Sequence, residues 1–240
     1  MAEESTQLRV LISGGFSGAY ERLLPEFRRT SGISVTTGSG ASQGSGPHTI
    51  AAQLARGVPA DVVILSREGL NELIAAGWIV AGTDIDLARV ALGVAVKAGT
   101  PKPDVSTVEA FKQLLLKANA VAIPASTSGI WLTEDLFPRL GVAGKIDVKA
   151  PPRGADAAAM AAAGSVAIAV MPVSEILHAP GVDLAGSLTP EIQFVQVFSA
   201  AVATGSGEIE GSRRLIGFLH SATAAEAIRN SGMEPHTDWN

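Results

Sequence analysis

Apolar positions along the chain fall into short continuous runs and into helical spacings, with small-residue turns between them. Residues 8–29 set the pattern: residues 8–12 are mostly apolar, as in a strand covered on both faces. Gly14 and Gly15 interrupt this run, and Ser17 is positioned to cap a following helix. Pro25 inside that helix predicts a kink or a late start. The apolar face of the helix is formed by Tyr20, Leu23, Leu24 and Phe27.

The same alternation continues through the rest of the chain. Short connections between apolar strands and helices favour a mostly parallel α/β sheet. Further strands are predicted at residues 33–37, 60–65, 90–96, 120–123, 146–148, 166–171 and 193–203. Further helices are predicted at residues 49–55, from 67 to about 76, 105–116, 130–140, 155–163, 209–219 and 222–230.

Five strands end in turns of small or polar residues. In parallel α/β sheets, ligands bind at the carboxyl ends of the strands, and helix N-termini there attract anions. We therefore expect these turns to line one cleft that holds a small anion. The five turns are residues 13–17, 38–46, 65–67, 124–129 and 151–154.

Composition and charge limit the classes of partner that this chain is expected to bind. Of 240 residues, 47% are hydrophobic and 17% charged, as in a globular protein with a sizeable core. The net charge of −5 argues against nucleic acid as a partner, although local arginines can still bind a small anion. There is no cysteine and no apolar run of about 18 residues, so we expect neither a thiolate site nor a membrane span.

One motif suggests a hydrolase. Residues 40–44, GASQG, match the G-x-S-x-G nucleophile elbow, with Ser42 as the nucleophile and His178, His220 or His236 as a base. An elbow requires a helix directly after the serine, and here Gly44 to Pro47 intervene. A flexible anion-binding loop is the better interpretation, so a serine hydrolase remains only the second alternative.

The chain carries no cofactor or metal motif. G-x-G-x-x-G fails after Gly38 and after Gly44, and the one Gly-Lys pair, at Gly144, is not followed by Ser or Thr. No two of the four histidines are spaced i, i+4. We expect no cofactor and no metal.

Two arginines are the strongest candidate ligands for an anion. Arg67 and Arg153 each stand where a strand gives way to a helix, and a cation is disfavoured at a helix N-terminus unless an anion offsets it. Guanidinium groups pair bidentately with carboxylates. Ser126 and Ser128, in the turn at 124–129, add hydroxyl donors or act only as helix caps.

At this point the chain resembles the periplasmic type II solute-binding proteins, in the molybdate-binding-like branch of ABC-transporter receptors. The most specific segment is QLARGVPADVVIL at 53–65, and the resemblance covers nearly the whole chain. The other segments are LRVLISGGFSGAYERLLPEFRRTSGISV at 8–35, GASQG at 40–44, PASTSGIW at 124–131, VAIAVMPVSEI at 166–176 and AAEAIRNSGME at 224–234.

The resemblance implies two doubly wound α/β lobes joined by two crossover strands, with an anion bound between them. Lobe one is expected at 1–90 plus 200–240, lobe two at 91–199, and the hinge strands near 90–96 and 193–203. It also implies a periplasmic monomer that delivers its ligand to an ABC permease. The polar start has no signal-peptide core, so we expect any signal peptide to have been removed.

Departures from the family pattern change the expected ligand. Molybdate-binding members have a serine where this chain has Gly15, although Ser13 and Ser17 flank it, and a tyrosine where it has Met171. Arg67 replaces a commonly acidic residue, and Arg153 an apolar one. Fewer oxyanion donors and two added cations favour a larger organic anion with two or three carboxylates. Predicted ligand-binding residues are Ser13, Gly15, Ser17, Ser42, Arg67, Ser126, Ser128, Arg153 and Met171.

An isomerase is the first alternative function. The family is similar to a bacterial aconitate isomerase, so the fold can host isomerisation of an unsaturated tricarboxylate. Such a reaction needs a general base that titrates near neutral pH. His48 is the leading candidate, and Glu68 and Asp156 are weaker ones.

Overall fold

The computed structural model describes residues 6–239, which divide into two compact units. One unit ends at Arg89 and resumes at Val197, and the other is Val90–Gln196. The chain passes from one unit to the other within two strands, β4 (Ile85–Lys97) and β9 (Val195–Val202). Each unit is described separately below; we call the first the terminal unit and the second the central unit.

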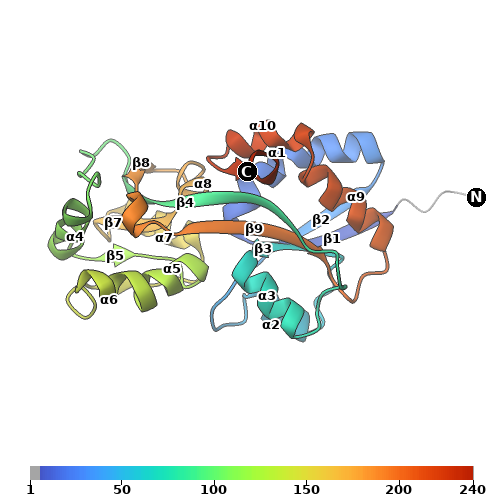
Figure 1. Cartoon of the computed structure of the whole chain (residues 1–240), viewed down its shortest axis with the longest axis horizontal. Helices are drawn as coiled ribbons and strands as arrows, with labels where there is room; N and C mark the ends of the chain where they lie inside the picture. The colour runs from blue at the N-terminus through green and yellow to red at the C-terminus, as the bar shows by residue number, and fades with distance from the viewer. Residues whose placement is uncertain (1–5, 240) are drawn as a thin grey trace, which may run out of the picture. The chain divides into compact units, whose positions relative to one another are not determined.

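The terminal unit is a mostly parallel sheet with helices on both faces. Strand β1 pairs in parallel with β2 and with β3, whereas β9 pairs antiparallel with β3. Figure 1 shows α1, α9 and α10 over one face of these strands and α2 and α3 over the other. The elements are β1 (Gln7–Ile12), α1 (Gly14–Ser31), β2 (Ser34–Ser39), α2 (Ile50–Ala55), β3 (Val62–Ser66), α3 (Arg67–Ala75), α9 (Ile209–Leu219), α10 (Ala222–Arg229), β10 (Glu234–Pro235) and the 3-10 turn η3 (His236–Asp238).

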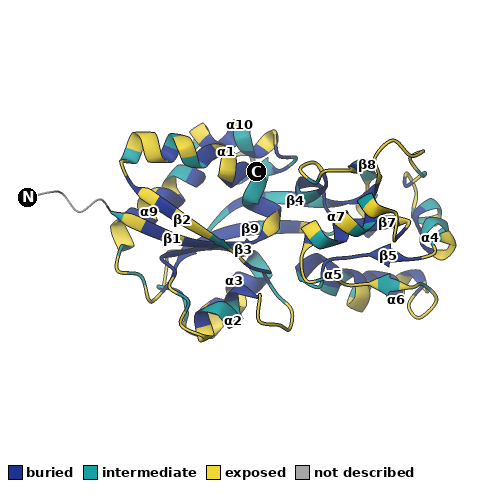
Figure 2. Ribbon diagram, turned by 180° about the vertical axis from the view of Figure 1, so that it is seen from behind, coloured by how far each residue is buried: buried dark blue, intermediate teal, exposed yellow. Residues whose placement is uncertain are grey.

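Burial explains why these residues form these elements. All five residues of β3 are buried, as expected for a central strand covered on both sides. On one face the Phe27 ring of α1 packs 5.5 Å from the Phe218 ring of α9. On the other face, Leu70 and Leu73 of α3 join a buried cluster with Ile50 of α2. Figure 2 shows β3 and most of β9 buried, whereas much of β2 and the outer faces of the helices are exposed.

The central unit has the same plan with shorter strands. Strand β5 pairs in parallel with β6 and β7, while β4 pairs antiparallel with β7 and with β8. The elements besides β4 and β9 are α4 (Val108–Lys117), β5 (Val121–Ala122), α5 (Thr127–Trp131), the π-helical η1 (Leu132–Leu136), α6 (Phe137–Leu140), β6 (Val148–Lys149), α7 (Gly154–Ala163), β7 (Ile168–Pro172), α8 (Val173–Ile176), β8 (Val182–Ser187) and the 3-10 turn η2 (Pro190–Ile192).

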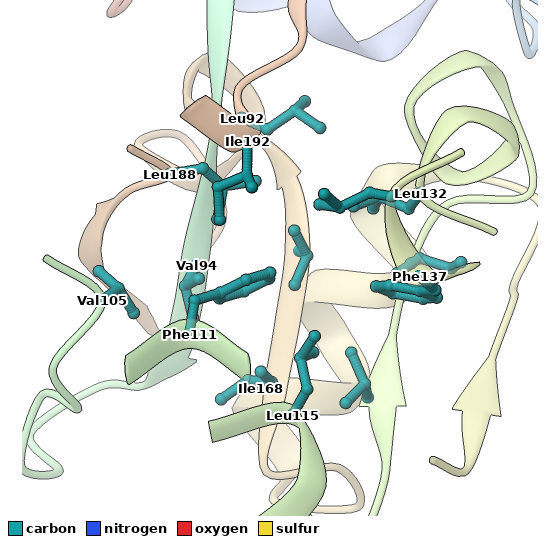
Figure 3. Packing of buried hydrophobic residues seen from close by; sticks show 14 of the residues in the cluster. Leu92, Val94, Val105, Phe111, Leu115, Leu132, Phe137, Ile168, Leu188 and Ile192 are labelled. Carbon is teal, nitrogen blue, oxygen red and sulfur yellow. The ribbon is translucent and has the colours of Figure 1, made fainter. Parts of the chain in front are cut away.

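Two different cores fill the two faces of the central sheet. Figure 3 shows one, in which Phe111 and Leu115 of α4 meet Val94 of β4 and Ile168 of β7. The other is rich in alanine, which lets α7 lie close to the strands. Helices on both faces of a mainly parallel sheet, in each unit, confirm the predicted α/β doubly wound class.

Several predicted boundaries are wrong, each for a local reason. Helix α1 begins at Gly14 rather than after Ser17, and it continues without interruption through Pro25. The predicted helix at 130–140 begins three residues earlier, at Thr127, and contains a π-helical turn. Strand β4 extends five residues further toward the N-terminus than the predicted strand at 90–96, because it also crosses the terminal unit. Strands β8 and β10 were not predicted at all.

Candidate functional site

The carboxyl ends of β1, β2 and β3 lie at one edge of the terminal sheet, since the three strands are parallel. Strands β1 and β3 lead directly into α1, after Ser13, and α3, after Ser66, whereas β2 leads into α2 through the loop at 40–49. Thr49 and Ser66 cap their helices with side-chain oxygens, at 3.1 Å from the N–H groups of Ala52 and Gly69. Helix α1 differs, because its N-cap side chain makes no such bond.

Ser13 is a buried hydroxyl without a partner at the start of the longest helix. Its backbone N–H donates to the Ile64 carbonyl at 2.9 Å, which ties the turn to β3. Its side chain is 4% exposed, and within residues 6–239 no group accepts from or donates to the Oγ atom. Ser17 lies inside the helix and donates to the Gly14 carbonyl at 2.6 Å. Ser13, not Ser17, is therefore the N-cap residue, and the predicted cap was wrong.

Position 15 has room only for glycine, because an aromatic ring fills the adjacent space. A methyl group built on Gly15 would overlap the ring of Phe198, a buried residue of β9. Phe198 also lies 6.5 Å, ring to ring, from Phe16. A serine at position 15, as in molybdate-binding members of the family that the sequence resembles, would have no room here. The ligand-binding role predicted for Gly15 stays a prediction.

Ser42 links its loop to β3 and α3. Its Oγ accepts a 2.9 Å hydrogen bond from the Ser66 N–H, and its carbonyl lies so close to Gly69 that no side chain fits there. The helix after Ser42 begins only at Ile50, so the strand–serine–helix geometry of a nucleophile elbow is absent from this described segment. The loop therefore packs against the start of α3, and the structure gives no support to the hydrolase alternative.

Arg67 is already paired with two carboxylates of this chain. Its guanidinium donates to Asp84 at 2.8 Å and, through Nε, to Asp86 at 2.7 Å. Asp86 also accepts from the Ser199 hydroxyl at 2.6 Å. The sequence pattern suggested that a ligand anion offsets this cation at the α3 N-terminus; in the structure, the offset comes from the two aspartates. Contact between Arg67 and a ligand stays a prediction.

Glu68, one of the candidate bases, lies in the first turn of α3. Burial raises the pKa of its carboxyl, and Oε2 is buried with no hydrogen-bond partner among the described residues. The other two candidates fare worse. His48 is exposed in the loop before α2. The pKa of Asp156 is lowered, mainly by its hydrogen bond with Arg153, so Asp156 is a weak base near neutral pH.

The central unit presents a second edge of the same kind. Strands β5, β6 and β7 are parallel, and α5, α7 and α8 begin just beyond their carboxyl ends. Ser126 is the N-cap residue of α5, and Ser128 is buried in its first turn. A side chain at Gly129 would overlap the Pro124 carbonyl, which explains the glycine in this turn.

Arg153 is the N-cap residue of α7 and pairs with Asp156 of the same helix. Its Nε and Nη2 atoms lie 3.0 and 2.8 Å from the carboxylate oxygens, and its side chain is about half exposed. The expected approach of Arg67 and Arg153 concerns residues of different units and stays a prediction. Met171 is fully buried in the alanine-rich core, where it packs among apolar side chains.

Glu175 is the residue that the sequence analysis missed. Its carboxyl lies against Gly154, the first residue of α7, where any side chain would overlap it. Burial raises the pKa of this carboxyl to about 7. An acidic residue in the first helical turn after a buried parallel strand was the available signal in the sequence.

Two further features bear on partners. Within residues 6–239, no three His, Asp or Glu side chains gather as metal ligands, and no helix combines the length and apolar character needed to cross a bilayer. Two histidines of the terminal unit pack with aromatic rings: His236 lies 5.0 Å from the His220 ring and 4.4 Å from the Trp239 ring.

Comparison with solved structures bears on the fold. The chain is similar to the sulfate-binding protein SubI of Mycobacterium tuberculosis, with a TM-score of 0.74 and 20% identity, covering 97% of this chain and 88% of that one. It is also similar to the periplasmic molybdate-binding protein of Azotobacter vinelandii, with a TM-score of 0.69 and 18% identity, covering 94% and 98%. At these identities the likeness establishes the shared fold.

Sequence comparison establishes the family as well as the fold. An aconitate isomerase from Pseudomonas sp. is 35% identical over 235 residues, which cover 98% of this chain and 90% of that protein. The model of the family described as bacterial extracellular solute-binding protein matches residues 8–234. This chain therefore belongs to the bacterial extracellular solute-binding protein family.

Proposed function

We propose that this protein binds a small organic anion with two or three carboxylates. The observation that carries the proposal is Ser13, a buried hydroxyl without a partner in the described chain, at the uncapped N-terminus of α1. The first N–H groups of a helix lack intrahelical partners and carry partial positive charge. A carboxylate accepts from both the N–H groups and the hydroxyl, and so satisfies all of them together.

An organic anion fits this position better than a bare tetrahedral oxyanion. The Phe198 ring against Gly15 leaves no room for the side-chain donor that a serine at this position would supply to an oxyanion. The neighbours named for molybdate and sulfate share only the fold with this chain, whereas the relative at 35% identity is named for aconitate, an unsaturated tricarboxylate. The family, described as extracellular solute-binding, further supports a role outside the cytoplasm, and we propose an ABC permease as the partner.

A thermal-shift screen tests the proposal. The protein is heated with molybdate, sulfate, citrate, cis-aconitate or trans-aconitate, and a specific ligand at 100 times its Kd adds about 2.7 kcal/mol of stability. Ser13→Ala should reduce the shift given by the best carboxylate. Ser31→Ala is the matched control, because that hydroxyl lies at the opposite end of α1 and bonds to the Phe27 carbonyl within the helix. Stabilisation by molybdate alone, or by no anion, contradicts the proposal.

The second candidate is isomerisation of an unsaturated tricarboxylate such as aconitate. It is favoured by the 35% identical relative and by two carboxyls, Glu68 and Glu175, whose pKa values are raised by burial. Incubation of the wild type with cis- or trans-aconitate, followed by proton NMR, separates the candidates. A receptor binds the acid and returns it unchanged, whereas an isomerase interconverts the two forms.

A further inference from the structure

Two buried side-chain oxygens without a partner lie at one edge of the terminal sheet. Ser13 follows β1 directly, and Glu68 comes two residues after the end of β3. Within residues 6–239, neither Ser13 Oγ nor Glu68 Oε2 has a hydrogen-bond partner. The two residues stand at neighbouring strand ends, because β1 and β3 pair in parallel. Buried polar groups are almost always hydrogen-bonded in native proteins, so two such atoms in one place point to a ligand that bonds with both.

The first turns of α1 and α3 are linked at this edge through β3 and β9. Figure 1 shows the two helices on opposite faces of the sheet. The Ser13 N–H donates at 2.9 Å to the carbonyl two residues before Ser66, the α3 N-cap. Ser66 pairs across the sheet with Phe198, whose ring lies against Gly15 in the first turn of α1. The start of α3, with Glu68, therefore neighbours the α1 N-terminus, where the proposed anion binds.

The Glu68 carboxyl has a protein partner on one side only. It makes a side-chain hydrogen bond with Ser66, whose Oγ also accepts from the Gly69 N–H at 3.1 Å. The side chain is partly exposed as a whole, but Oε2 itself is buried. Burial raises the pKa of the carboxyl, although its own N–H, Ser66 and Arg67 act in the opposite direction. A neutral acid suits this position, because it avoids a desolvated charge and has an O–H to donate.

The charged side chains around Glu68 also favour its neutral form. Arg67 precedes it on α3, but this cation pairs with Asp84 and Asp86. One positive charge thus faces two negative ones, and Asp86 raises the pKa of Glu68. Glu72, one turn further along α3, is exposed and accepts from a glutamine of the loop before α2. An anion at the α1 N-terminus adds more negative charge and raises the pKa of a neighbouring carboxyl further.

We propose that Glu68 binds the anion as a neutral acid, its O–H donating to one ligand carboxylate while another carboxylate lies at Ser13 and the α1 N-terminus. This inference rests on the proposed function and adds a second ligand contact to it. Its consequence is that the anion binds together with one proton. Affinity is therefore full below the pKa of Glu68 in the free protein, and it falls about tenfold for each pH unit above that pKa.

Isothermal titration calorimetry with trans-aconitate tests the inference, because this acid is fully ionised above pH 7 and carries no proton of its own into the site. Titrations in two buffers with different ionisation enthalpies give the number of protons taken up on binding. For the wild type we expect uptake to approach one proton per bound trans-aconitate at pH 8. The Kd should weaken by up to about tenfold from pH 7 to pH 8.

Glu68→Gln is the informative variant, because the amide keeps the shape of the acid and a donor while it does not titrate. We expect no proton uptake with this variant and a Kd that changes by less than about twofold from pH 7 to pH 8. The matched control is Glu21→Gln, at an exposed glutamate of α1 in the same unit. It should match the wild type in proton uptake and in the pH dependence of Kd.

The outcomes separate this inference from the proposed function. Binding of trans-aconitate by the wild type without proton uptake refutes the role of Glu68 and leaves the proposed function standing, and this result needs no variant to fold. Uptake that persists unchanged in Glu68→Gln, with circular dichroism like that of the wild type, also refutes it. Binding of neither trans-aconitate, cis-aconitate nor citrate refutes the proposed function itself.

Discussion

Replacing Glu175 by Gln should stabilise the protein, and the gain should depend on pH. Burial disfavours the charged carboxylate and raises its pKa from 4.5 to about 7. One pKa unit corresponds to about 1.4 kcal/mol, so ionised Glu175 costs the folded state about 3 kcal/mol. Glutamine is neutral at every pH and avoids this cost.

The stability difference between Glu175→Gln and the wild type should grow as pH rises, because the pKa of Glu175 is raised in the folded protein. Below pH 4.5 the carboxyl is protonated in both the folded and the unfolded chain, and wild type and variant should be about equally stable. As pH rises from 4.5 to 7, the unfolded chain releases its proton first, so the wild type loses stability relative to the variant. Above pH 7 the difference should level off at about 3 kcal/mol.

Urea unfolding of the wild type, Glu175→Gln and the control Glu134→Gln, at an exposed glutamate of the same unit, measures the effect at pH 4, 6 and 8. The difference between the wild type and Glu175→Gln should grow steadily across the three pH values, while Glu134→Gln should follow the wild type. The same difference at pH 4 and pH 8 would show that the carboxyl is well solvated in the folded protein, and the argument for its desolvation would be wrong.

Two other substitutions test the terminal unit. Asp61 is fully buried; burial opposes its ionisation, but hydrogen bonds from Arg9 and Ser206 outweigh this and hold its pKa below the ordinary value. Asp61→Asn should cost about 3 kcal/mol at pH 7, and urea unfolding should show the difference shrinking as pH falls below 3.8, because the unfolded chain then takes up a proton at Asp61 before the folded protein does. Gly15→Ala should cost about 1–3 kcal/mol through overlap with Phe198, and adding Phe198→Leu should recover part of that loss; no recovery would show that another contact sets the cost.

The sequence by itself was sufficient for the fold class and most of the elements. A buried parallel strand and an amphipathic helix each have a local signature, because burial follows the periods of the strand and the helix. The runs at 8–12, 60–65 and 166–171 therefore located β1, β3 and β7 within a residue or two. Turn glycines and serines likewise identified the edges that carry the candidate sites.

The boundaries of α1 show where local signals fail. Both Ser13 and Ser17 are good capping residues, and the choice between them depends on a hydrogen bond from the Ser13 N–H to Ile64, which belongs to another strand. The glycine at position 15 likewise has a tertiary cause, because an aromatic ring from β9 fills the space that a side chain there would need. Neither partner can be read from the neighbouring residues.

Only the tertiary structure decided the charges of the site. Arg67 looked like a cation awaiting a ligand until β4 brought Asp84 and Asp86, 17 and 19 residues further along the chain, within hydrogen-bonding distance. Glu175 drew no attention in the sequence, whereas in the structure its carboxyl packs against Gly154 and burial raises its pKa. Charge and pKa depend on desolvation and on distances to groups remote in sequence, and local periodicity carries no record of either.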